Sequence, residues 1–210
     1  MLTVETDLVA VEERLGSGRL ACPGCSAVLA RWGHARGRQV RDADGRLWIV
    51  PRRARCTGCG ATHVLLPVVL LVRRADSAAV IGAGLTAKAS GAGHRLIAAL
   101  LGRPPETVRG WLRRFSCRVE PVRVVFTQWC RDLQPDPVLP GPAGSAWADA
   151  IAAILAAAVA VRARFLLGEV PVWQAAVAVS AARLLAPGWP ARPTQTDQHE
   201  LTLTFSDLPR

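Results

Sequence analysis

The sequence predicts an α+β fold, in which a small unit of short antiparallel strands precedes a mostly α-helical remainder. Two Cys-x-x-Cys pairs enclose a stretch rich in glycine and arginine, a pattern typical of a small metal-held unit. Apolar residues then recur at helical spacing from residue 77 to about residue 119, and two alanine-rich stretches follow residue 145. The chain has 210 residues, 50% of them hydrophobic, so it can bury a core but is short for most multi-domain enzymes.

Composition and charge narrow the class of partner. The formal net charge is +10, residues 21–118 alone carry +13, and Lys88 is the one lysine. Because guanidinium groups match phosphate geometry, we expect a polyanionic partner. The first twenty residues are acidic and lack a secretory signal, and no stretch reaches the roughly 18 uncharged apolar residues of a membrane-spanning helix. We therefore expect a cytoplasmic protein without membrane contact.

Composition shifts divide the chain into six segments. Residues 134–145 hold four prolines and two glycines, which favours a linker. The predicted segments are an N-terminal segment (1–20), a zinc ribbon (21–75), a helix-turn-helix (76–120), a Pro-rich linker (121–145), an Ala-rich helical hairpin (146–190) turned at residues 168–171, and a polar tail (191–210) with a short strand at 201–205.

The two cysteine pairs carry the strongest signal in the sequence. Cys22 and Cys25 form one knuckle, Cys56 and Cys59 form another of identical spacing, and short strand-like runs with a turn at 42–45 lie between them. Two such knuckles complete the thiolate tetrahedron that zinc prefers, so we expect a zinc ribbon with a structural Zn²⁺. Free thiols or two disulfides are the alternative. His34 and His63 lie near enough in sequence to compete as ligands.

Residues 94–118 have the pattern of a helix-turn-helix. Gly102 marks a turn, Pro105 suits the first turn of the second helix, and an apolar set can interlock across the corner, namely Ile97, Ala98, Leu101, Val108 and Trp111. A plain helical bundle with a solvated basic face is the alternative. The residues expected to contact DNA are Arg103, Pro105, Glu106, Thr107, Arg109, Gly110, Arg113, Arg114 and Arg118, with Arg52, Arg53 and Arg55 of the ribbon. Arg103 stands in the turn, where an apolar residue is commoner, and we expect it to face a phosphate.

The segments Cys-Pro-Gly-Cys, Cys-Thr-Gly-Cys-Gly-Ala-Thr-His-Val-Leu-Leu-Pro and residues 91–115 resemble the zinc-ribbon plus helix-turn-helix head of insertion-sequence transposases. They are still more similar to short bacterial proteins that carry this head without a recombinase body. The resemblance covers about residues 20–120 and implies recognition of terminal DNA, with Cys22, Cys25, Cys56 and Cys59 as zinc ligands and residues 105–118 as the recognition helix.

The remainder of the chain departs from the transposases. Their catalytic domain needs three carboxylates that converge on two metal ions, and the scattered acidic residues after 119 have no supporting strand pattern. We therefore expect no enzymatic activity. The alanine-rich helices are expected either to dock on the helix-turn-helix or to form a homodimer.

The sequence thus predicts a protein that binds double-stranded DNA, as a transcriptional regulator or as an accessory of a mobile element. A zinc-ribbon adaptor that binds another protein, or a transposase-derived protein without its catalytic domain, is the alternative.

Overall fold

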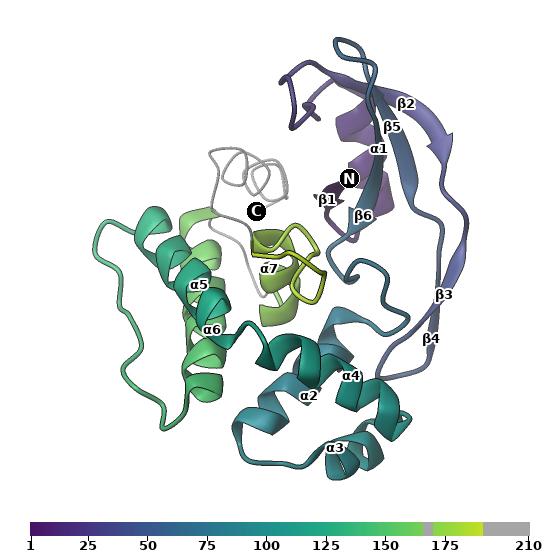
Figure 1. Ribbon diagram of the computed structural model, residues 1–210. Coiled ribbons are helices and arrows are strands. Elements are labelled where there is room, and N and C mark those ends of the chain that lie inside the picture. The colour runs from purple at the N-terminus through teal and green to yellow at the C-terminus, as the bar shows by residue number, and fades with distance from the viewer. Residues whose placement is uncertain (166–169, 191–210) are drawn as a thin grey trace.

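The computed structural model describes residues 1–165 and 170–190 and has an α+β fold, with a small N-terminal sheet followed by several helices (Figure 1). The strands are β1 (Leu2–Val4), β2 (Leu29–His34), β3 (Arg38–Arg41), β4 (Arg46–Ile49), β5 (Arg52–Cys56) and β6 (Thr62–Pro67). The helices are α1 (Leu8–Gly16), α2 (Ala78–Ala89), α3 (His94–Leu101), α4 (Pro105–Ser116), α5 (Val119–Leu133), α6 (Ala146–Phe165) and α7 (Val172–Val179). The predicted fold class is confirmed.

The N-terminal sheet has the strand order β1-β6-β5-β2, and β1 alone pairs in parallel. Strands β3 and β4 form a separate antiparallel hairpin that continues the β2–β5 pair, because the Ala35 N–H donates to the Pro51 carbonyl across the bend. Asp7 caps the N-terminus of helix α1, because its side chain accepts hydrogen bonds from the backbone of Val9 and Ala10. One face of this sheet and α1 bury a core of their own.

The residues predicted as a separate N-terminal segment are part of this sheet. Leu2 pairs with Leu65 and Val4 with Pro67, and all four side chains are buried. The guanidinium of Arg14 on α1 binds the Glu5 carboxylate at 2.7 Å, and both side chains are almost fully buried. A buried ion pair of this kind is costly to break from one side, so the segment is anchored to the ribbon.

Helices α2 to α4 lie at the end of the β3–β4 hairpin (Figure 1). Helices α3 and α4 meet at a turn that Gly102 makes in the left-handed conformation, with φ of 60°. The apolar set predicted to interlock across this corner is buried, except that Leu101 is half-buried. A second core runs from these helices into α5, α6 and α7.

The linker predicted at residues 121–145 is shorter than expected, because residues through Leu133 belong to α5. Pro121 lies in the first turn of this helix, where its missing N–H removes no helical hydrogen bond. The apolar residues on its buried face recur at helical spacing, at positions 122, 125, 126, 129 and 130.

The C-terminal helices pack on the rest of the chain. The Trp147 indole N–H donates to the Leu85 carbonyl of α2 at 3.0 Å, and its ring lies 4.8 Å from that of Phe115. Helix α6 is long and apolar enough to cross a membrane by length and composition alone, and 44% of its most apolar window is buried inside the protein. The predicted turn at 168–171 falls mostly outside the described residues, and the predicted tail and its strand at 201–205 lie wholly outside them.

Candidate metal centre and basic surface

The two cysteine knuckles have matching backbone hydrogen bonds. In the first, Cys22 N–H donates to the Ala27 carbonyl and Ser26 N–H to the Cys22 carbonyl, both at 2.8 Å. In the second, the N–H of Cys56 donates to the carbonyl of residue 61 at 2.8 Å, and that of Gly60 to the Cys56 carbonyl at 3.2 Å. Ser26 and Gly60 both have positive φ, of 60° and 73°. One local turn is therefore built twice, and each copy aims two sulfurs at the same point.

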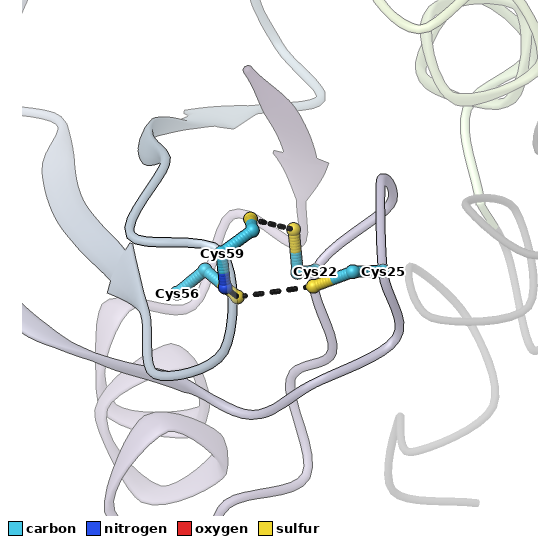
Figure 2. A group of neighbouring side chains, drawn as sticks. All are labelled: Cys22, Cys25, Cys56 and Cys59. Atoms are coloured by element: carbon cyan, nitrogen blue, oxygen red, sulfur yellow. Dashed lines mark hydrogen bonds between the residues drawn. The ribbon is translucent and has the colours of Figure 1, made fainter.

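Figure 2 shows the four sulfurs converging between the knuckles. The Cys22 and Cys59 sulfurs are 3.8 Å apart, those of Cys25 and Cys56 are 3.3 Å apart, and all four lie within 4.8 Å of one another. A metal with sulfur bonds of about 2.3 Å in a tetrahedron holds its sulfurs about 3.8 Å apart. The four cysteines can therefore hold one metal ion, and four protein ligands would fill the coordination sphere, as in a structural site.

The pKa values of Cys56 and Cys59 are shifted by hydrogen bonds within the cluster. A hydrogen bond from the backbone N–H of Cys59 is the main cause that lowers the pKa of Cys56 to about 6. The Ala61 N–H favours the thiolate of Cys59, but hydrogen bonds shared with Cys56 and Cys25 outweigh it and raise the Cys59 pKa to about 11. The pKa values of Cys56 and Cys59 thus move in opposite directions, and a bound cation would favour the thiolate form of both.

Of the two histidines considered as ligands, His63 lies beside the cluster and His34 does not. The Nε2 of His63 is 3.5 Å from the Cys22 sulfur, and burial, followed by the charge of the Met1 amine, lowers the pKa of this histidine. His34, at the far end of β2, contacts the guanidinium of Arg52 instead. Among the described residues, no other group of three or more Cys, His, Asp or Glu side chains lies close enough to hold a metal ion.

Arg103 does not face outward as expected. Its side chain is only 13% exposed, its Nε binds the Asp76 carboxylate at 2.7 Å, and its Nη2 donates to the Asp42 carbonyl at 2.8 Å. The other carboxylate oxygen of Asp76 binds Arg41 of β3, also at 2.7 Å. Asp76 is 2% exposed, so the charge of Arg103 is paired with a buried carboxylate. The ion pair locks the α3–α4 turn onto the tip of the β3–β4 hairpin, a role that sequence reasoning missed.

The outward face of α4 exposes two of the arginines that were expected to contact DNA. Arg109 and Arg113 are exposed one turn apart, and Arg109 forms an i,i+3 ion pair with Glu106, in which the side chains are 65% and 71% exposed. Arg114 donates to the Gly110 carbonyl within the helix, and Arg118 is half-buried. Of the other predicted contacts on this helix, Pro105 is exposed and Thr107 is half-buried.

The three ribbon arginines differ in how freely they can reach a ligand. Arg52 binds the Glu12 carboxylate of α1, and only 16% of its side chain is exposed. Arg53 and Arg55 alternate with the buried Ala54 and Cys56 along β5, and thus lie on the opposite face of the strand. The guanidinium of Arg55 sits 4.8 Å above the Trp32 ring. Of these three arginines, Arg53 and Arg55 are therefore better placed than Arg52 to reach an external partner.

Comparisons with known proteins give a match to only part of the chain. Residues 22–98 match a family model described as a domain of unknown function (DUF6431). The match begins at the first metal-site cysteine and ends inside α3, so it includes the complete cysteine cluster but not α4. No curated protein matches the chain, and no solved structure does.

Proposed function

We propose that this chain is a DNA-binding protein in which a structural zinc ribbon supports a helix-turn-helix, and that it acts as a transcriptional regulator or a mobile-element accessory. The observation that carries the proposal is the outward face of α4, where Arg109 and Arg113 are exposed one turn apart. That spacing suits contacts with base edges or phosphates in a major groove.

The metal proposed for the cysteine cluster is Zn²⁺. Four thiolates at near-tetrahedral spacing form the donor set that this ion prefers, and such a site contributes folding energy rather than chemistry. Cys22, Cys25, Cys56 and Cys59 would hold the ion. The zinc would fix the end of the sheet where the two knuckles meet.

The attachment of α4 to the ribbon supports the proposal further. The Arg103–Asp76–Arg41 ion pairs hold the α3–α4 turn against the β3–β4 hairpin, so α4 is attached to the ribbon near its N-terminus. Arg53 and Arg55 of β5 would then add phosphate contacts while α4 enters the groove. Each phosphate contact steepens the salt dependence of binding by about 0.9 in log–log slope.

The experiment is selection of zinc-loaded protein on a random duplex DNA pool at about 50 and 200 mM salt, followed by sequencing of the retained DNA. Enrichment of a motif supports sequence-specific recognition, and a two-fold motif supports a homodimer. If DNA is retained only at the lower salt and no motif is enriched, the protein binds DNA without sequence specificity. No retention at either salt contradicts the proposal. Running the same selection on structured RNA checks the preference for DNA.

A second candidate is a protein adaptor, and the first helix of the pair favours it. Leu96 and Leu100 stand one turn apart on α3 and are 56% and 70% exposed, although side chains of this kind are usually buried. An apolar contact of this type is insensitive to salt, in contrast to phosphate binding. Binding to a protein partner that persists from 50 to about 500 mM salt and is lost in Leu100→Asp supports the adaptor.

A further inference from the structure

A cavity lined by Met1 and by six residues from two other parts of the chain collects positive charge. It has a volume of about 430 Å³ and lies between the connection after β6 and the segment that follows α7. Its lining includes Val72, Arg73, Arg74, Arg183, Ala186 and Pro187. Three of these are arginines from two distant parts of the chain, and no acidic side chain lines the cavity among the described residues.

The charge of these arginines is not neutralised by carboxylates of the described chain. Arg73 and Arg183 are exposed and form no ion pair with any described residue. Arg74 donates one hydrogen bond to the Leu185 carbonyl at 3.0 Å, and its buried Nε has no partner within the described residues. Burial lowers the pKa of Arg74, and the nearby charge of Arg114 lowers it further. An anion in the cavity would relieve this repulsion.

The backbone around the cavity is held in an unfavourable conformation. Arg73 has φ of 57°, and Ala181 and Ala182, which directly precede Arg183, have φ of 47° and 60°. These are three of the four non-glycine residues with positive φ in the described chain. The Val72 N–H donates to the Ala182 carbonyl at 2.9 Å and ties the two walls together. Residues in this left-handed region persist only where their surroundings fix them, and they cluster at ligand sites.

We propose that this cavity binds a small phosphate ester of about mononucleotide size. The guanidinium groups of Arg73, Arg74 and Arg183, which line the cavity, hold the phosphate, since arginine donates two parallel hydrogen bonds to phosphate oxygens. The carbon skeleton packs on Val72 and Pro187. The volume lies within the range of about 300–1,000 Å³ in which proteins bind small molecules.

The lining of this site does not include Arg109 or Arg113, on which the proposed DNA binding by α4 rests. By joining the segment after α7 to the connection between the ribbon and α2, a bound ester would stabilise the docking of the C-terminal helices. A phosphate of a nucleic-acid backbone has the same chemistry as the ester, so the experiment must separate the two sources.

The experiment titrates zinc-loaded, full-length protein with adenosine monophosphate at constant ionic strength, by calorimetry and by thermal shift. We expect saturable binding to the wild type and to Arg131→Gln, a matched control on α5 that removes an exposed arginine outside the cavity lining. Arg183→Gln should weaken the binding at least tenfold without lowering the melting temperature of the ligand-free protein. It should leave the affinity for duplex DNA unchanged.

Absence of saturable binding to the wild type would overturn the proposal, and so would an equal loss in both variants, which would show that only net charge matters. If Arg183→Gln weakens duplex binding while adenosine monophosphate does not bind, the cavity belongs to a nucleic-acid backbone and the small-ligand proposal is wrong. If the protein binds adenosine monophosphate but retains no DNA in the selection, the proposed DNA-binding function is refuted and the proposed phosphate-ester site is not.

Discussion

Replacing Gly82 by Ala tests whether the C-terminal helices pack on α2 of the same chain. A Cβ atom at Gly82 would lie less than 3.0 Å from three atoms of the Trp173 ring on α7, a distance that real Cβ atoms essentially never show. At Gly84, one half-turn further along α2, the nearest atoms to a Cβ would be those of Ile97 and Leu101 at 3.4 Å, which is ordinary contact. The two substitutions add the same methyl group at two buried positions of one helix.

The structure therefore predicts opposite signs. Either substitution gains about 1 kcal/mol, because alanine is the better helix former. Overpacking against Trp173 costs about 3 kcal/mol at Gly82, so Gly82→Ala should lower the free energy of unfolding by about 2 kcal/mol. Gly84→Ala should raise it by about 1 kcal/mol.

Urea unfolding of zinc-loaded protein, followed by tryptophan fluorescence and circular dichroism, measures both changes. Gly82→Ala made in a Trp173→Ala background is the internal control. Without the ring, Gly82→Ala should raise the free energy of unfolding by about 1 kcal/mol relative to Trp173→Ala alone. If Gly82→Ala is as stable as Gly84→Ala, Trp173 does not lie on α2. The C-terminal helices would then be free to pair with a second copy of the chain.

Three further predictions concern the cysteines and their turns. Cys56→Ser should release the metal and unfold residues 21–67, since the binding energy of a structural site is largely folding energy. A zinc indicator measures the metal release, and amide hydrogen exchange measures the unfolding. Amide protection that survives the loss of metal would contradict the prediction. Gly60→Ala should lower the free energy of unfolding by about 1–2 kcal/mol, because Gly60 has φ of 73°. Ser26→Gly, at the matching position of the first knuckle, should not lower it. Equal losses in thermal or denaturant unfolding would refute the matched-turn geometry. Cys117 is exposed and should react with iodoacetamide in the folded protein, whereas Cys130 is buried with a raised pKa and should react only on unfolding, as site-resolved mass spectrometry would show.

Sequence reasoning worked where the structural signal is local. The repeated Cys-x-x-Cys spacing identified all four cysteines of the cluster, because a tight turn places both sulfurs without help from the rest of the fold. Gly102 and Pro105 marked the end of α3 and the start of α4, since each residue has a conformational preference that stops or starts a helix. The fold class followed from the same two kinds of signal.

Sequence reasoning failed where a partner lies far away in the chain. The pairing of β1 with β6 joins residues more than sixty positions apart, and three residues are too few to show a strand period. The role of Arg103 depends on Asp76 and on the Asp42 carbonyl, so its spacing within α3–α4 could not separate an internal ion pair from a phosphate contact. In α5 the apolar spacing was present, but the neighbouring prolines obscured it.

The most direct test of the proposed function is the affinity of three zinc-loaded proteins for a selected duplex, measured by fluorescence anisotropy over a range of salt. The wild type is compared with the double variant Arg109→Ala and Arg113→Ala, and with Arg131→Ala as a control of exposed charge on α5. We predict that the double variant loses about 2–6 kcal/mol of specific binding and melts at the wild-type temperature, while the control stays within about 0.5 kcal/mol of the wild type. Wild-type affinity in the double variant would contradict the account, because α4 would then not be the helix that recognises DNA.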